Sequence, residues 1–299
     1  MIRLALRVQR ASAELVLAEL LELAPSGVEE IDKGGDTVEY AVYGSPGELP
    51  ELPDVRAAAA GALVEVSTSE IPDDWDERWK QFHSPVLVEA PDAASFGISP
   101  GAAQSGASPP ASSLYVRAPW QPQCELRGVE EVVIEPARAF GTGAHHTTRL
   151  TLSLLLELAG RGVRGGVLDV GTGSGVLAIA AAKLGFAPVR ALDHDPESVE
   201  AAIANALANG VEIDVERHDI REQAPPVAEV SILLANLLRP LLLELAESMT
   251  QAPEHLLISG LLRGEASEVA EAFARHSLSE RRRLEAGEWA AVWLTRSED

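Results

Sequence analysis

The hydrophobic and polar positions of residues 1–68 follow a rhythm of short strands and two helical runs. The segment IRLALRV alternates as a half-buried strand does, and Ser12 precedes a helical run that breaks at Pro25. A hairpin, a second alanine-rich helix and a last strand follow. This order of strand, helix, strand, strand, helix, strand predicts a ferredoxin-like α+β domain. The segment holds no cluster of His, Cys or acids with catalytic spacing, so we expect it to dock or pack rather than to carry chemistry.

Residues 69–84 and 91–113 differ from the segments around them. In the first, three aromatic residues between Trp75 and Phe82 recur at i, i+4 and i+7, which predicts a linker helix with one packed face. The second consists mainly of Pro, Gly, Ser and Ala and cannot bury enough surface to order itself, which predicts a flexible loop. A strand-like LYVRA follows directly, so we place this loop inside a second domain at residues 85–299.

From Val167 to the C-terminus, apolar strands alternate with helical runs, as in an open α/β sheet. One helical run begins at Pro196 and stops at Gly210, residue types that are typical of helix ends. Two final alternating stretches flank Gly287 and predict an antiparallel hairpin at the edge of the sheet. The strands expected before that hairpin are VLDV, VRALD, EIDVERH, SILLAN and HLLIS.

Composition narrows the class of protein. With 299 residues, of which 46% are hydrophobic, the chain is long enough for one large or two modest globular domains. Cys124 is the single cysteine, which excludes an intramolecular disulfide and an iron–sulfur cluster held by several cysteines of this chain. No apolar run approaches the roughly 20 residues that span a bilayer. We therefore expect a cytoplasmic protein with neither a signal peptide nor a membrane anchor.

The formal net charge of −22 argues against direct binding of nucleic acid, because proteins that bind it present a basic surface. The charge favours a small or basic partner, and simple solubility explains it equally well. Charge alone therefore identifies no site.

Asp169 opens a D-x-G-x-G-x-G pattern at the end of one predicted strand, and its glycines are Gly171, Gly173 and Gly175. Glycines let the backbone turn sharply and approach a ligand closely. Val176 stands where both the dinucleotide fingerprint and the phosphate-binding loop require glycine. A nucleoside ligand without a pyrophosphate therefore fits this turn better than NAD or ATP does. An ordinary glycine-rich turn is the alternative.

Further polar side chains lie at the carboxyl ends of the predicted strands, where open α/β sheets collect their ligands. Asp193 ends the second of these strands, and a carboxylate there can accept hydrogen bonds from both hydroxyls of a ribose. Together with the glycine turn, this describes S-adenosylmethionine. Asp219 is placed to reach the adenine amino group. Asn236 ends the fourth strand, opposite the methyl donor, although an isolated Asn there is also a common helix cap.

A second glycine-containing turn, AFGTGAHHTT, leads into another helix. Thr147 and Thr148 stand near its start, and the free N–H groups of a helix N-terminus can hold a carboxylate or a ribose. His145 is either a wall of the ligand pocket or a turn residue that bonds its own backbone. No further Cys or His pair completes a metal-binding spacing, so we expect no metal site.

These motifs resemble those of the bacterial methyltransferase family that modifies the L-eleven protein of the large ribosomal subunit. The similarity runs nearly end to end, and the AFGTGxHxTT element separates this family from generic methyltransferases. The sequence departs from the family pattern at Ala137, where a glycine often follows IEP, and in the inserted loop at 91–113. The motifs that match are WxxxWKxxF, IEPxxAFGTGxHxTT, LDVGTGSGVLAIAAxKLG, DxDP, ANLLRPL, SGLL and GEW.

The resemblance implies a Rossmann-like class I methyltransferase domain with a seven-stranded sheet, preceded by a ferredoxin-like domain that recognises the substrate. It implies S-adenosylmethionine as the methyl donor and a basic ribosomal protein as the acceptor, methylated at lysine or N-terminal amines. Another lysine-containing protein is an alternative substrate. A protein that binds S-adenosylmethionine without turnover is an alternative function, and Val176 disfavours a nicotinamide-dependent oxidoreductase.

The same resemblance implies that Asn236 contacts the donor and that the segment from Phe140 to His145 closes over it. For the transfer itself, we expect the side-chain oxygen of Asn236 and nearby carbonyls to accept N–H bonds of the substrate amine and to aim its lone pair. The full set of predicted donor contacts, from the motifs and the resemblance together, is Phe140, Gly141, Thr142, His145, Thr148, Asp169, Gly171, Gly173, Asp193, Asp219 and Asn236.

Overall fold

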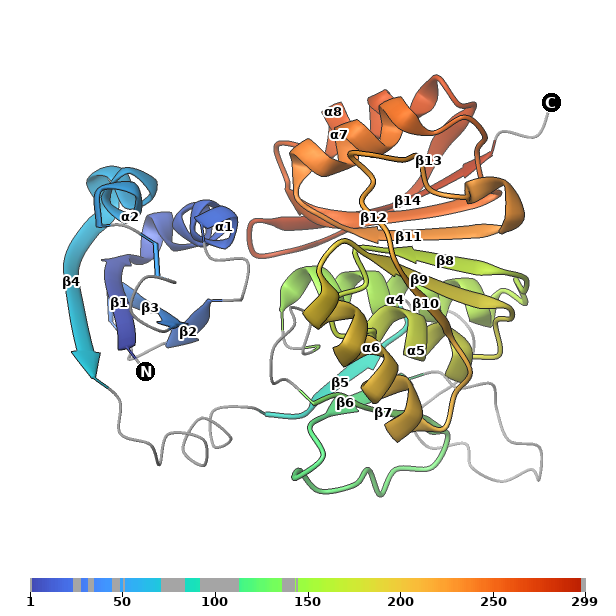
Figure 1. The fold of residues 1–299 in the computed structure, drawn as a ribbon, viewed down its shortest axis with the longest axis horizontal. Coiled ribbons are helices and arrows are strands. Elements are labelled where there is room, and N and C mark those ends of the chain that lie inside the picture. Colours follow the sequence, from blue (N-terminus) through green and yellow to red (C-terminus); the bar gives the residue numbers. More distant parts are fainter. Residues whose placement is uncertain are drawn as a thin grey trace. The chain divides into compact units, whose positions relative to one another are not determined.

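The computed structural model divides the chain into two compact units, Met1–His83 and Ser84–Asp299 (Figure 1). It describes residues 2–23, 28–31, 35–44, 49–50, 52–70, 84–91, 113–135, 143 and 145–296. The predicted linker helix around Trp75 and nearly all of the predicted loop at 91–113 lie outside these residues. Their conformation stays a prediction, as do the roles expected for the two domains.

The first unit is a four-stranded sheet with two helices. All its strand pairs are antiparallel, and the strand order is β2-β3-β1-β4. The helices bury the apolar residues that alternate along β1, such as Leu4 and Leu6, together with Leu17 and Leu20 of the first helix. The order of elements is that of a ferredoxin-like unit. The elements are β1 (Ile2–Gln9), α1 (Ala13–Leu23), β2 (Glu29–Ile31), β3 (Thr37–Gly44), α2 (Leu52–Ala59) and β4 (Leu63–Glu70).

The second unit is built on a seven-stranded sheet, as predicted. Its order is β10-β9-β8-β11-β12-β14-β13, and β14 runs antiparallel to both of its neighbours while the first five strands are parallel. This confirms the α/β class and the antiparallel hairpin at the edge. The strands are β8 (Val167–Val170), β9 (Val189–Asp193), β10 (Asp214–Arg217), β11 (Ile232–Asn236), β12 (His255–Leu262), β13 (Leu278–Ala286) and β14 (Trp289–Arg296).

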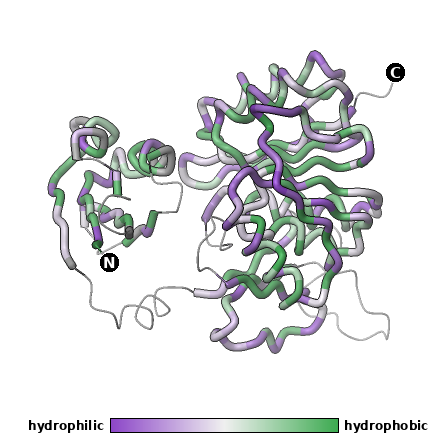
Figure 2. The backbone as a smooth tube through the Cα atoms, in the orientation of Figure 1, coloured by the Kyte–Doolittle hydropathy of each residue, from purple (hydrophilic) through white to green (hydrophobic). Residues whose placement is uncertain are grey.

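Helices cover both faces of this sheet (Figure 1). α7 (Arg239–Ser248) and α8 (Ala266–Ala274) pack together on one face, and α4 (His146–Gly160), α5 (Val176–Lys183) and α6 (Pro196–Asn209) pack on the other. Strands covered on both faces read as continuous apolar runs, and all four residues of β8 are buried. In Figure 2 the central strands are accordingly mostly hydrophobic.

A third, smaller sheet of order β5-β6-β7 belongs to the same unit. Its strands are β5 (Val86–Glu89), β6 (Ser113–Arg117) and β7 (Val129–Val133), with β6 antiparallel to β5 and parallel to β7. The strand-like LYVRA predicts β6, whereas β5 was not predicted. That strand has four residues, of which two are exposed, and such a short run carries little periodicity.

Two asparagines one turn apart on α6 attach this small sheet to the large one. Asn209 Nδ2 donates to the Val133 carbonyl at 2.6 Å, and Asn209 Oδ1 accepts from the Val133 N–H at 2.9 Å. Asn205 Oδ1 accepts from the Glu135 N–H at 2.9 Å, and Asn205 Nδ2 donates to the Ser174 carbonyl at 2.8 Å. The segment that leaves β7 is thereby fixed beside the glycine turn that follows β8.

Replacing Asn209 by alanine removes both partners of the Val133 backbone. We expect Asn209→Ala to lower the free energy of unfolding by about 1–3 kcal/mol, the cost of leaving such groups unpaired. Denaturant unfolding measures this value. Leu207→Ala on the same helix is the control, because Leu207 is 76% exposed and its truncation should change stability by less than about 0.5 kcal/mol. A loss no larger than that of the control would show that the pair of bonds adds nothing to stability.

Candidate functional site

The candidate site lies at the carboxyl ends of β8, β9 and β11. β8 pairs with β9 on one side and with β11 on the other, so the ends of all three strands are adjacent. Asp169 is the third residue of β8, Asp193 ends β9 and Asn236 ends β11. The structure thus brings three of the predicted side chains to one edge of the sheet.

The glycine turn after β8 needs residues without a Cβ. Gly171, Gly173 and Gly175 have φ angles of 71°, 54° and 83°, in the left-handed region that other residues rarely adopt. The N–H groups of Gly171 and Thr172 donate to the Leu192 carbonyl at 2.8 and 3.0 Å, which ties the turn to the end of β9. Gly175 then begins α5 as its N-cap.

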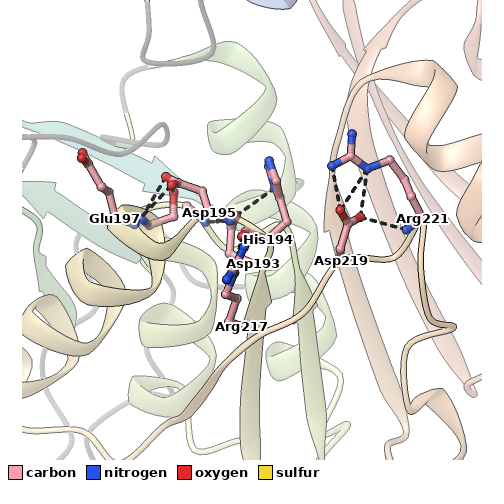
Figure 3. A network of polar contacts seen from close by, with 9 residues as sticks. Asp193, His194, Asp195, Glu197, Arg217, Asp219 and Arg221 are labelled. Carbon is pink, nitrogen blue, oxygen red and sulfur yellow. Dashed lines mark hydrogen bonds and ion pairs between the residues drawn. The ribbon is translucent and has the colours of Figure 1, made fainter.

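Asp193 is a nearly buried carboxylate that the turn already holds in place. Its Oδ2 accepts from the Gly173 N–H at 2.9 Å, and its Oδ1 accepts from the Asp195 N–H at 3.0 Å (Figure 3). His194 Nδ1 lies 3.3 Å from the same Oδ1. Each carboxylate oxygen has two acceptor positions. The two N–H bonds leave one acceptor position on each oxygen, so Asp193 keeps capacity for the two hydroxyls of a ribose when His194 Nδ1 does not donate.

Asp169 is fully buried behind the glycine turn. Its Oδ2 accepts from Thr172 Oγ1 at 2.7 Å and from the Ala178 N–H at 3.2 Å, whereas its Oδ1 has no hydrogen-bond partner among the described residues. Burial raises the pKa of this carboxyl to about 7, opposed by the bonds from Thr172 and Ala178, and the charge of Asp193 raises it further. A buried oxygen with no partner is suited to a hydrogen-bond donor on a ligand.

Asp219 lies in the loop after β10 and is engaged by Arg221. Asp219 Oδ1 accepts from the Arg221 Nε and backbone N–H at 2.9 and 3.0 Å, and Oδ2 accepts from Arg221 Nη2 at 2.7 Å. The Arg221 guanidinium holds the pKa of the Asp219 carboxyl well below its usual range. In Figure 3 no dashed line joins this pair to the Asp193 network. Arg221 thus engages both oxygens of Asp219, and contact between Asp219 and an adenine amino group stays a prediction.

His145 caps the start of α4. Its Nδ1 accepts from the Thr147 N–H at 3.3 Å and lies 2.8 Å from Thr147 Oγ1. Its ring meets the edge of the Trp289 ring with 4.9 Å between centroids. Burial lowers the pKa of the imidazole to about 4, with a smaller contribution from His146, so the ring is neutral near pH 7. The structure thus shows His145 as a turn residue that bonds the nearby backbone, which is one of the two interpretations of its sequence position. Its contact with a ligand stays a prediction.

Asn236 turns toward α4 rather than toward the helix that follows it. Its Nδ2 donates to Thr148 Oγ1 at 3.4 Å, which leaves Oδ1 as an acceptor. The N-cap of α7 is Leu238, and no side chain caps that helix. The alternative reading of Asn236 as a helix cap is therefore wrong.

Three residues of this region were not assigned a role from sequence. Ser259 Oγ donates to the Thr147 carbonyl at 3.2 Å, Trp289 packs against His145, and Gly260 lies against the backbone of Leu237. The first and last of these positions fall in the SGLL motif and the tryptophan in the GEW motif, which were the only signals of their importance. The predicted contacts Phe140, Gly141 and Thr142 lie outside the described residues.

Within the described ranges, no group of three or more His, Cys, Asp and Glu side chains could hold a metal ion. No helix in the same ranges has the length and hydrophobicity to cross a membrane.

Comparison with known proteins identifies relatives of this chain. Residues 110–297 match the model of a family described as Ribosomal protein L11 methyltransferase (PrmA). A protein of that name from Geobacter sulfurreducens is 32% identical over 284 residues, which cover 89% of this chain and 83% of the relative. One from Myxococcus xanthus is 31% identical over 299 residues and covers 95% of each chain.

A solved structure is also similar. The crystal structure of ribosomal protein L11 methylase from Lactobacillus delbrueckii subsp. bulgaricus has 31% sequence identity and a TM-score of 0.54. The alignment covers 62% of this chain and 95% of that structure.

The raised pKa of Asp169 predicts a pH-dependent effect on stability. In the unfolded chain the carboxyl titrates near 3.8, whereas in the fold it titrates near 7, so the cost of burying its charge develops as pH rises between these values. Asp169→Asn keeps the shape without the charge. We expect its free energy of unfolding to rise relative to the wild type by a few kcal/mol, on the order of 1.4 per pKa unit, from pH 4.5 to pH 8.

Denaturant unfolding at several pH values measures this difference. Asp214→Asn on β10, an exposed carboxylate, controls for loss of a charge. Parallel pH profiles for the wild type and Asp169→Asn would contradict the assignment of a strongly destabilised carboxylate at Asp169.

Proposed function

The chain belongs to the ribosomal protein L11 methyltransferase family, and from this premise we propose that it transfers methyl groups from S-adenosylmethionine to amines of a large-subunit ribosomal protein. The fold and the family make it a methyltransferase that uses S-adenosylmethionine. What we propose beyond this is that the acceptor group is a lysine or N-terminal amine.

The observation that carries this proposal is the convergence of a glycine turn, Asp193 and Asn236 at the point where the strand order reverses. This point is where open α/β sheets bind nucleosides. The residues fit the donor in three ways. Asp193 keeps acceptor capacity for a ribose, the turn lacks the glycine that a pyrophosphate requires, and Asp169 offers a buried acceptor to a cationic amino group.

When bound, S-adenosylmethionine supplies an electrophilic methyl group on a sulfonium. The acceptor amine must first lose a proton, because an ammonium has no free lone pair, and a low-dielectric site favours its neutral form. Asn236 Oδ1 accepts an N–H of the amine and aims the lone pair, since Thr148 holds the other end of the amide. The C–N bond would form as the C–S bond breaks, and the products would be a thioether and a methylated ammonium that can lose a proton to solvent.

The main contribution of the protein is to hold the amine and the methyl group at attack distance, an effect that can be worth several kcal/mol. His145 is neutral near pH 7, so it adds no positive charge beside a cationic donor. This agrees with a site that accepts a sulfonium. Phe140, Gly141, Thr142 and His145 are proposed to close over it, and Thr148, Asp169, Gly171, Gly173, Asp193 and Asp219 to contact it.

We assign substrate recognition to residues 1–68 and the connection to residues 69–84. The net charge of −22 supports a basic protein as substrate, because opposite charge speeds encounter. A ribosomal-protein substrate implies a cytoplasmic enzyme.

Methyl transfer is tested by incubating the wild type with methyl-labelled S-adenosylmethionine and purified ribosomal protein L11, followed by mass spectrometry of the product. We expect label on lysine or N-terminal amines. Absence of label on that protein, or calorimetric binding of NAD in place of S-adenosylmethionine, would overturn the proposal.

Asp193→Ala removes the predicted hydrogen bonds to the ribose. We expect donor binding to weaken by about 1.5–3 kcal/mol, the usual value for hydrogen bonds to a charged group. Calorimetric titration with the donor measures this loss. Asp214→Ala on the exposed edge strand is the matched control and should bind the donor as the wild type does. Unchanged affinity in Asp193→Ala would mean that the ribose lies elsewhere.

Asn236→Ala separates orientation of the amine from donor binding. We expect kcat to fall by about 100-fold or more, because the lone pair of the amine is no longer oriented toward the methyl group. The donor Kd should change much less. Steady-state kinetics and calorimetry on the same preparation give both values. Equal losses in the two would make Asn236 a donor contact only.

A further inference from the structure

Leu237, the residue that follows Asn236, is held between two glycines. On one side, a Cβ added at Gly171 would overlap Leu237 Cδ2. On the other side, a Cβ added at Gly260 would overlap the Leu237 carbonyl oxygen and would lie 2.7 Å from its carbonyl carbon and 3.0 Å from its nitrogen. The first contact is with the end of a flexible side chain, whereas the second is with the backbone itself.

Gly260 lies in an irregular stretch of β12. The pairing of β12 with β14 shifts register between Ile258 and Leu261, and Gly260 within that shift has a φ of 85°. Both features are typical of a β-bulge that re-aims a strand near a functional site. The consequence is that the Cα of Gly260 lies against the Leu237 peptide.

Ser259, the preceding residue of the same bulge, connects it to the rest of the site. Its carbonyl accepts from the Leu237 N–H at 3.1 Å, and its hydroxyl donates to the Thr147 carbonyl at 3.2 Å. Asn236 is the register partner of Ser259 in the parallel pairing of β11 with β12. The bulge therefore contacts both the chain beside Asn236 and the first turn of α4, where Thr148 receives the Asn236 amide.

We propose that Gly260 is a positioning residue for methyl transfer, because its missing Cβ lets the Leu237 peptide lie where Asn236 Oδ1 meets the incoming amine. This inference rests on the proposed role of Asn236. A side chain at position 260 would push the Leu237 backbone, and Asn236 is bonded directly to it. The bond from Asn236 to Thr148 is already 3.4 Å long, so a small shift would break it.

Gly260→Ala tests the inference, and Gly185→Ala is its matched control. Gly185 has the same φ of 85°, and a Cβ there would meet no atom within 4 Å. The two variants therefore share the backbone strain of a left-handed alanine and differ in the collision with Leu237. Any effect of Gly260→Ala beyond that of Gly185→Ala reports the displaced peptide.

The experiment measures kcat, the KM for the protein substrate and the calorimetric Kd for S-adenosylmethionine in the wild type, Gly260→Ala, Gly185→Ala, Asn236→Ala and the Gly260→Ala/Asn236→Ala double variant. We expect Gly260→Ala to lower kcat by about 100-fold, the cost of a misplacement near 1 Å. We expect its donor Kd to equal that of Gly185→Ala. In the Asn236→Ala background, Gly260→Ala should cause no further loss of kcat, since there is no amide left to misplace.

Three results would overturn the inference while leaving the proposed function intact. They are a kcat equal to that of Gly185→Ala, a donor affinity that falls as much as kcat, and additive losses in the double variant. A wild type that transfers no methyl group overturns the proposed function and this inference with it. The wild type and Asn236→Ala therefore separate the two failures.

If circular dichroism shows that Gly260→Ala does not fold, Leu237→Ala tests from the side of Gly171 whether the Leu237 segment positions Asn236. This variant removes the side chain that rests against Gly171 and leaves Gly260 in place. Its loss of kcat must disappear in the Asn236→Ala background. A loss that persists there would contradict positioning of Asn236 by this peptide.

Discussion

The reversal of strand order at β8 is the constraint on which the site depends. β8 pairs in parallel with β9 and with β11, while α5 and α7, which follow β8 and β11, pack on opposite faces of the sheet (Figure 1). The segments that follow β8 and β11 leave the sheet toward opposite faces, so the carboxyl ends of these strands stay uncovered. Residues as far apart in sequence as Asp169, Asp193 and Asn236 meet there for this reason. The glycines at this edge are what allow backbone segments to approach so closely.

The two carboxylates beside the glycine turn differ in their burial and in their hydrogen-bond partners. Asp193 accepts backbone N–H groups at both oxygens. Asp169 is fully buried with one oxygen that has no partner in the described part of the chain, and its pKa rises to about 7. The two carboxylates thus differ in how far the described residues satisfy their oxygens.

Much of the fold was predictable, because its signals are local. α6 begins at Pro196 after the cap Asp195 and ends at Gly210, as its sequence indicates. The four buried residues of β8 and the hairpin at Gly287 were equally plain. β5 was missed because a run of only four residues carries little periodicity. Asn236 was ambiguous for a different reason, since an Asn before a helix has the same sequence signature whether or not its side chain caps that helix.

The sequence by itself determined the element order, the glycine turn and which polar residues end the strands, because periodicity, capping and glycine spacing act between near neighbours. Only the tertiary structure decided what those residues touch. In the folded chain the Asn236 amide bonds Thr148, which lies on a helix far earlier in the sequence. Asp219 pairs with Arg221, and Gly260 lies against the Leu237 peptide. These contacts depend on how strands from distant parts of the chain pair and in which register. No local pattern of side chains encodes the distance between two backbones that meet across a sheet.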